Sequence, residues 1–117
     1  MAPRILVTTN PLSSLDVMRE LAPAGYDIVT AAAGSPEFRA ALPEAEYLVG
    51  LGEASMDDGF YRDAGKLRLV QLLSAGYDRV DIEAARRARV PVCNNGGANA
   101  VAVSEHAILL MLAVSRR

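Results

Sequence analysis

Hydrophobic and polar residues divide the chain into short apolar runs separated by longer segments in which apolar residues recur at helical spacing. The short runs predict five β-strands. Most are nearly continuous in apolar character, as in Ile5-Leu6-Val7, and this is typical of strands covered on both faces of a parallel sheet. The predicted strands cover residues 4–9, 26–32, 47–51, 67–73 and 91–93.

A predicted helix follows each strand. Ser13 with Asp16 fits a capping box, Ser35 before Pro36 fits an N-cap followed by proline at the first helical position, and Asp81 fits a third N-cap. The first helix has one apolar stripe, formed by Leu15, Met18, Leu21 and Ala22. The helices are expected near residues 13–22, 36–42, 55–64, 82–89 and 100–117.

Five consecutive β-α units indicate a parallel sheet with helices on both faces, joined by right-handed crossovers. Their number and the short loops favour a flavodoxin-like, three-layer α/β/α fold with a five-stranded sheet in the order 2-1-3-4-5. Residues 1–117 are expected to form this single domain, without a linker or an internal repeat.

The last predicted helix is apolar on every side, because the segment 107–114 contains eight consecutive apolar residues. A helix that lies on one sheet needs only one apolar face, so this helix is expected to have more than one partner. The segment Ser115-Arg116-Arg117 has no glycine cap. We therefore expect the chain to be a fragment of a larger protein, and residues 100–117 to form a homodimer or a swapped assembly.

Composition and charge exclude several classes of partner. Of the 117 residues, 51% are hydrophobic and 22% are charged, which is typical of a globular protein. The net charge of −2 predicts neither a nucleic-acid nor a membrane partner. The only cysteine, Cys93, excludes a disulfide within the chain and is interpreted as a core residue. We expect a cytoplasmic protein.

Ligands of such a sheet bind beyond the carboxyl ends of its strands, and the first loop there argues against a dinucleotide. Residues 8–14 contain no glycine that would let the backbone approach a pyrophosphate, so we expect no NAD bound to this domain alone. The hydroxyl-rich segment leaves a flavodoxin-type FMN site open as an alternative. Glu53 stands alone, without the acidic cluster of a phosphoryl-receiver domain.

Two other loops carry stronger signals. Residues 74–78 and 94–99 each follow an apolar strand and precede a helix, so each presents backbone N–H groups that would donate hydrogen bonds to a small carboxylate. The alternative is that Gly76, Gly96 and Gly97 only permit tight turns. Spacing alone does not decide between these interpretations.

Three segments of the chain together resemble the D-isomer-specific 2-hydroxyacid dehydrogenases. They are Leu69 to Asp81, with Ala75-Gly76-Tyr77-Asp78-Arg79-Val80-Asp81 at its end; Val90-Pro91-Val92-Cys93-Asn94-Asn95; and Val103-Ser104-Glu105-His106-Ala107. The match is ordered over about 50 residues, and the β-α layout agrees over the whole chain.

The resemblance implies a substrate domain from which the nucleotide-binding domain is missing. In the family, NAD or NADP carries the hydride, and the long helix runs between the two domains and helps to form the dimer. Backbone N–H groups around Ser74, Ala75 and Gly76 would hold the carboxylate of a small 2-keto or 2-hydroxy acid. Asn99 would lie near the substrate, and Val103 near the cofactor.

The chain also departs from the family pattern. The family's catalytic arginine, its orienting carboxylate and its proton-transferring histidine come later in the family's sequence. His106 matches the helix motif and is interpreted, with Glu105, as structural. We therefore expect no catalytic residue, no bound cofactor and no metal in this chain, and no activity from it alone. A free-standing flavodoxin-like binding or scaffold module remains the alternative.

Overall fold

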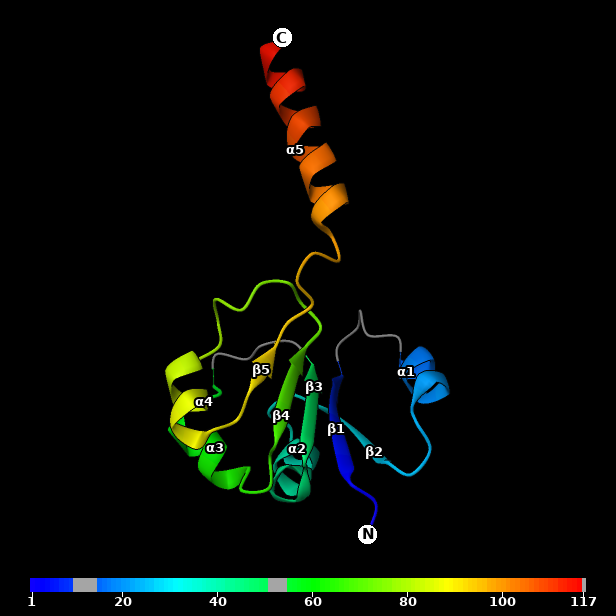
Figure 1. The fold of residues 1–117 in the computed structure, drawn as a ribbon, viewed down its shortest axis with the longest axis vertical. Coiled ribbons are helices and arrows are strands. Elements are labelled where there is room, and N and C mark those ends of the chain that lie inside the picture. The colour runs from blue at the N-terminus through cyan, green and yellow to red at the C-terminus, as the bar shows by residue number, and fades with distance from the viewer. Residues whose placement is uncertain (10–14, 51–54, 117) are drawn as a thin grey trace.

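The computed structural model describes residues 1–9, 15–50 and 55–116 (Figure 1). Strands and helices alternate along the described chain as the hydrophobic pattern predicts. Their bounds are β1 Arg4–Thr9, α1 Leu15–Leu21, β2 Asp27–Ala32, α2 Pro36–Ala41 with a 3-10 turn Leu42–Glu44, β3 Tyr47–Gly50, α3 Asp58–Asp63, β4 Leu69–Leu72, α4 Ile82–Ala88, β5 Val92–Cys93 and α5 Ala100–Ser115.

All neighbouring strands pair in parallel, in the order β2-β1-β3-β4-β5, which confirms the predicted topology. Ile5 is level with Ile28 of β2 and with Tyr47 of β3, and Tyr47 is level with Leu69 of β4. The carboxyl ends of all five strands therefore lie at one edge of the sheet, from which α5 projects (Figure 1).

Side-chain caps fix where the short helices begin. The Ser35 hydroxyl accepts a hydrogen bond from the Phe38 N–H at 3.1 Å, and Pro36 occupies the first turn. The Asp81 carboxylate accepts from the Ala84 N–H at 2.9 Å. Both predicted caps are confirmed. Ser13, the third predicted cap, lies outside the described residues.

The core lies on one face of the sheet, beneath α2, α3 and α4. Alternate strand residues point into it, and each of these three helices contributes small or apolar side chains. The strand side chains of this core include Leu6, Leu48, Val70 and Leu72, and its helical side chains include Phe38, Ala41, Tyr61, Ala84 and Ala85.

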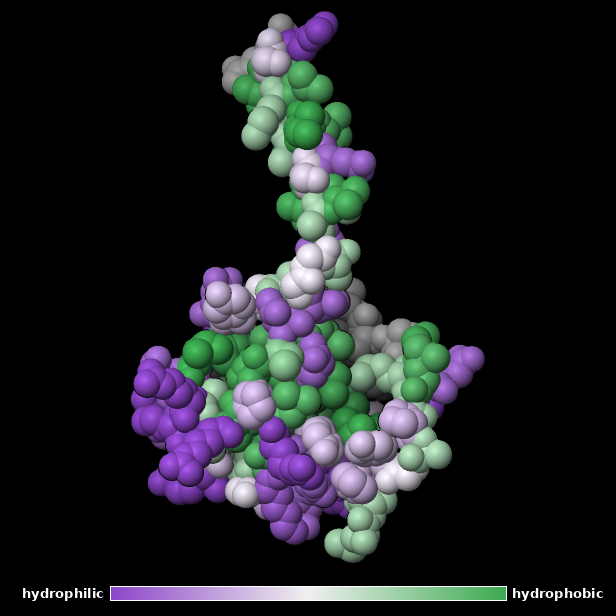
Figure 2. All heavy atoms as spheres, viewed as in Figure 1, coloured by the Kyte–Doolittle hydropathy of each residue, from purple (hydrophilic) through white to green (hydrophobic). Residues whose placement is uncertain are grey.

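The other face of the sheet is much less covered, and we call its central part the open face. Burial alternates along β3 and β4, so the residues between the core positions are only half-buried. Hydrophobic residues gather over the strands between α4 and α1 (Figure 2). The open face consists of Ile5, Tyr47, Val49, Leu69, Gln71, Leu73 and Cys93.

One sequence interpretation fails on this side of the sheet, and one predicted apolar stripe is left exposed. Cys93 was expected in the core, but it is level with Gln71 on the open face and its side chain is exposed. Leu21 belongs to the predicted apolar stripe of the first helix, and it is 75% exposed because α1 hardly packs on the strands. In both cases the residue is apolar, while no described element covers it.

Helix α5 points away from the body along the strand direction, and none of its residues is buried (Figure 1). The longest dimension of the molecule is therefore 60 Å, against 33 and 23 Å for the other two. Among the described helices, none has the length and apolarity required to cross a membrane.

Candidate functional site

The turn after β4 is the centre of the candidate site. It begins at Ser74, whose hydroxyl donates to the Gly76 carbonyl at 2.8 Å and so closes the turn on itself. Ser74 and Ala75 are half-buried, while Gly76 is exposed to solvent. The turn is thus held in shape while its outer edge stays accessible.

The second predicted loop lies directly against this turn. The Asn94 side-chain amide donates to the Ala75 carbonyl at 2.7 Å, and the Asn95 N–H donates to the Ser74 carbonyl at 2.9 Å. The structure therefore brings together the two loops that the sequence singled out separately. Asn94 was predicted only as part of the 94–99 loop, and its side-chain contact with the turn was not predicted, although its place directly after β5, beside β4, is a signal that could have identified it.

Backbone N–H groups of the turn are available to a ligand. Within the described residues, the Ala75 and Gly76 N–H groups donate to no protein acceptor, while the Ser74, Ala75 and Gly76 carbonyls each accept a hydrogen bond. Two neighbouring N–H donors at a strand end suit an anion of carboxylate size.

The glycines of the two loops differ in what they require. Gly97 has a φ of 82°, which a residue with a side chain rarely adopts, so its turn alone accounts for that glycine. Gly76 is not among the positive-φ glycines of the described chain, and a Cβ placed on it would meet Asp78 Oδ2 at an ordinary 3.4 Å. Turn geometry alone therefore does not explain Gly76.

Gly50, at the end of β3, contacts both the residue before the turn and β1. The Leu73 N–H, directly before the turn, donates to the Gly50 carbonyl at 2.7 Å. A Cβ on Gly50 would lie 1.7 Å from Thr8 Oγ1 and 2.9 Å from Thr8 Cβ, so only glycine fits beside the buried Thr8. Sequence reasoning missed this contact, because the two residues are distant in the chain.

Asn99 and Val103 lie at the start of α5. The Asn99 carbonyl accepts from the Val103 N–H at 2.9 Å, and the Asn99 side chain makes no capping hydrogen bond. Both residues are exposed, and within the described chain no hydrogen bond joins either to the Ser74–Gly76 turn. Their predicted roles beside substrate and cofactor stay predictions.

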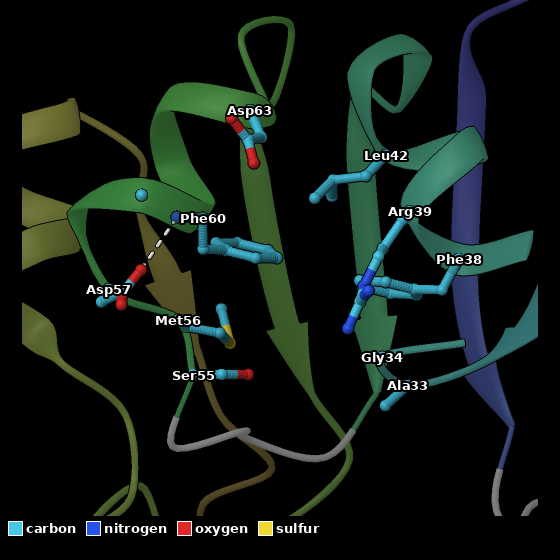
Figure 3. A pocket seen from close by; sticks show the side chains of 11 residues that line it. Ala33, Gly34, Phe38, Arg39, Leu42, Ser55, Met56, Asp57, Phe60 and Asp63 are labelled. Atoms are coloured by element: carbon cyan, nitrogen blue, oxygen red, sulfur yellow. Dashed lines mark hydrogen bonds between the residues drawn. The ribbon is translucent and has the colours of Figure 1, made fainter. Parts of the chain in front are cut away.

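A separate pocket lies between α2 and α3, on the face of the sheet opposite the open face. Its volume is about 410 Å³, and the Phe38 and Phe60 rings approach each other across it, with Arg39 reaching over one side (Figure 3). Asp57 at its rim is engaged in capping α3, where it accepts from the Phe60 N–H at 2.9 Å. The sequence analysis did not anticipate this pocket.

The remaining candidates add no further chemistry to the described chain. His106 is exposed on α5 beside Glu105. No group of three histidine, cysteine or acidic side chains among residues 1–9, 15–50 and 55–116 is arranged to hold a metal ion. Glu53 and most of the segment that suggested FMN lie outside these residues, so the FMN interpretation is neither supported nor contradicted.

Comparison with known proteins adds independent information. A family model described as the catalytic domain of D-isomer specific 2-hydroxyacid dehydrogenase matches residues 5–115. D-3-phosphoglycerate dehydrogenase of Mycobacterium tuberculosis (strain H37Rv) is 37% identical over 78 residues, which are 67% of this chain and 15% of that protein. Glyoxylate/hydroxypyruvate reductase B of Yersinia pestis (strain Pestoides F) is 34% identical over 82 residues, or 70% of this chain and 25% of that protein.

A solved structure agrees on the fold. NAD-dependent formate dehydrogenase from Staphylococcus aureus, determined in complex with NAD, matches with a TM-score of 0.74 at 20% identity, over 94% of this chain and 37% of that one. The chain spans only 15% to 25% of the length of the two curated relatives.

Proposed function

The chain belongs to the D-isomer-specific 2-hydroxyacid dehydrogenase family, as its catalytic domain, and from this membership we propose that it binds the carboxylate of a small 2-keto or 2-hydroxy acid at the Ser74–Gly76 turn. The observation that carries the proposal is the pair of Ala75 and Gly76 N–H groups, which have no acceptor within the described chain. They lie at the carboxyl edge of the sheet, where ligands of this fold bind.

The two joined loops suit recognition of a charged ligand. Hydrogen bonds to a charged group contribute about 1.5–3 kcal/mol each, and a turn already held by its neighbours loses little entropy when it binds. Asn94 and Ser74 supply that support through their bonds to Ala75 and Gly76. We propose Asn99, exposed at the start of α5, as a second contact to the substrate.

Hydride transfer itself is proposed for a protein that carries a nucleotide-binding domain as well. NAD or NADP would supply the hydride there, and residues 100–117 would connect the two domains, with Val103 near the cofactor. Hydride donor, acceptor and acid–base group must lie within a few ångströms of one another. The 117-residue chain contains a single histidine, on α5, and no G-x-G-x-x-G segment. We therefore propose that the chain alone does not turn over substrate. We also propose that the protein acts in the reducing environment of the cytoplasm.

Titration of the chain with glyoxylate, followed by amide NMR, tests the binding proposal. The Ala75 and Gly76 amide resonances should shift in a saturable manner, with a dissociation constant near the millimolar range, because two charge-assisted hydrogen bonds correspond to about 4 kcal/mol. Glycolaldehyde, which has no carboxylate, is the matched ligand control and should leave both resonances unmoved.

Two substitutions at one position separate the N–H group from the side chain. Ala75→Pro removes the donor and should abolish the response to glyoxylate, while Ala75→Ser keeps the donor and should preserve it. Glyoxylate shifts that centre on another part of the chain, or that survive in Ala75→Pro, would sink the proposal.

An activity measurement tests the second part. The chain mixed with NADH and glyoxylate, pyruvate or hydroxypyruvate should oxidise no NADH above the protein-free rate. Protein-dependent turnover that grows with the concentration of the chain would show that the catalytic groups are already present.

A further inference from the structure

The pocket between α2 and α3 has apolar walls whose positions are fixed by the core. Phe38 from α2 and Phe60 from α3 lie on opposite sides of it, and Leu42 and Met56 line the space between them (Figure 3). Phe38, Leu42 and Met56 are buried members of the hydrophobic core. The Phe60 ring packs edge to face on the Tyr61 ring, with centroids 5.1 Å apart. The pocket is therefore formed before any ligand enters it.

The size of the pocket suits a small ligand. Its volume of about 410 Å³ lies near the lower end of the range of roughly 300–1,000 Å³ that is usual for small-molecule sites. Apolar cavities of about 150 Å³ already accept a benzene ring. One ring, or two fused rings with a short polar substituent, would therefore occupy this space.

Arg39 provides a positive charge at the pocket. Its side chain extends from α2 over one side of the space between the two phenylalanine rings (Figure 3). Within the described chain, Arg39 takes part in no ion pair, and the cations that do are Arg4, Lys66, Arg68, Arg86 and Arg87. A guanidinium group binds a carboxylate through two parallel hydrogen bonds. Arg39 is thus available to an anionic group of a ligand.

The two acidic residues of the pocket do not occupy the same place as this cation. The Asp57 carboxylate accepts a hydrogen bond from the Phe60 N–H at 2.9 Å and is engaged in capping α3. Asp63 is the last residue of α3, and the Arg39 side chain is directed away from it (Figure 3). A carboxylate placed on the Arg39 guanidinium would therefore not meet the Asp63 carboxylate.

We propose that this pocket binds a small aromatic carboxylic acid, with its ring between Phe38 and Phe60 and its carboxylate on the Arg39 guanidinium. The site is separate from the Ser74–Gly76 turn, because no residue that lines the pocket belongs to that turn. The proposal goes beyond carboxylate binding at the turn and does not rest on it.

The lining favours an aromatic ring over an aliphatic group of the same size. Aromatic rings attract one another in edge-to-face and offset arrangements beyond the effect of the buried area, and the pocket offers two of them. The Met56 thioether adds a favourable contact between sulfur and a ring. An aliphatic acid would gain only the burial of its apolar surface.

Titration with indole-3-acetate, followed by NMR of the Phe38 and Phe60 rings and the Met56 methyl group, tests the proposal. All three sets of resonances should shift in a saturable manner. Arg39→Gln should weaken binding about fivefold or more, because the exposed guanidinium loses a charge-assisted contact. Indole-3-ethanol has the same ring without the carboxylate, so it should bind the unaltered chain more weakly and should not distinguish it from Arg39→Gln.

Two variants control for position and shape. Arg19→Gln removes an exposed arginine on α1, outside the pocket, and should leave the affinity for indole-3-acetate unchanged. Phe60→Leu keeps an apolar side chain but removes the ring, and should weaken binding of both indole ligands. Circular dichroism of each variant establishes that it is folded.

Excess glyoxylate separates this pocket from the turn. Because glyoxylate is directed to Ala75 and Gly76, it should not alter the affinity for indole-3-acetate, and failure of either site is then seen by itself. The proposal is refuted if indole-3-acetate shifts centre on the turn, if no saturation occurs below about 10 millimolar, or if Arg39→Gln binds as tightly as the unaltered chain. Equal binding of indole-3-ethanol and indole-3-acetate would also overturn it, since the carboxylate would then play no part.

Discussion

Gly50→Ala should destabilise the protein more than any ordinary glycine substitution in a strand. The added Cβ would lie 1.7 Å from Thr8 Oγ1 and 2.9 Å from Thr8 Cβ, both far inside van der Waals contact. Rotation of the Thr8 side chain moves its hydroxyl but not its Cβ, so the clash cannot be relieved without separating β1 from β3. Thr8 is only 5% exposed, so its side chain cannot move out into solvent without a shift of the strand.

The magnitude follows from the cost of overpacking. Insertion of a methyl group into a filled interior typically costs 1–3 kcal/mol, and alanine recovers about 0.5–1 kcal/mol of this through its lower conformational entropy in the unfolded chain. Because a Cβ only 1.7 Å from Thr8 Oγ1 places the cost at the upper end of this range, we expect a net loss of about 2 kcal/mol in the free energy of unfolding. Displacement of the strand would also lengthen the hydrogen bond from the Leu73 N–H to the Gly50 carbonyl, directly before the Ser74–Gly76 turn.

Urea unfolding at one fixed protein concentration measures this loss, and a double-mutant cycle assigns its cause. Thr8→Gly removes the clashing atoms at some cost of its own. In the double variant Gly50→Ala/Thr8→Gly, the alanine should therefore cost at least about 1 kcal/mol less than in the unaltered background. Additive effects, or a loss for Gly50→Ala below about 0.5 kcal/mol, would show that β1 and β3 do not approach as closely as described.

Three further predictions concern single side chains. The Tyr61 hydroxyl is buried without a hydrogen-bond partner in the described chain, and burial, with a smaller effect of the Asp81 charge, raises the pKa of Tyr61 to about 12. The folded-state pKa lies above the unfolded value of about 10, so the neutral hydroxyl stabilises the folded state at high pH less and less. The free energy of unfolding should be unaffected below pH 10 and should fall by roughly 2–3 kcal/mol as the pH rises from 10 through 12, measured by urea unfolding. Tyr61→Phe should remove that dependence and leave stability at pH 7 unchanged or higher by about 1 kcal/mol; an unaltered pH profile would contradict the assignment. Asp81→Ala should cost about 1 kcal/mol through loss of the bond to the Ala84 N–H, while Asp81→Asn retains most of it, and equal losses in both would exclude capping as the cause. Asn94→Ala should weaken the response of the Ala75 and Gly76 amide resonances to glyoxylate severalfold, because the turn loses the bond from the Asn94 amide to the Ala75 carbonyl, and an unchanged response would show that this bond does not hold the turn in its binding conformation.

Most of the fold could be predicted from the sequence, because the signals that define it are local. A β-rich run of six residues fixed the bounds of β1, and Ser35, Pro36 and Asp81 marked the starts of α2 and α4. The strand order followed from the count of β-α units and the handedness of their crossovers. These inferences need only spacing and residue type.

The candidate site was predictable in part for the same reason. That loops at the carboxyl ends of neighbouring strands meet at one edge is a property of the topology, and the contact of Asn94 with Ala75 agrees with it. The tight approach of Gly50 to Thr8 and the pocket between α2 and α3 depend on distances between elements. Spacing along the chain carries no information about such distances.

The failed interpretation of Cys93 and the exposure of Leu21 share one physical origin. An apolar residue indicates that burial of its side chain is favourable, but it does not indicate which molecule or segment buries it. The interpretation of Cys93 as a core residue assumed that the chain supplies helices for both faces of its own sheet. Among the residues that the structure describes, helices pack closely on one face only, and part of the other face and the uncharged helical segment Ala107–Val114 are exposed in the same chain.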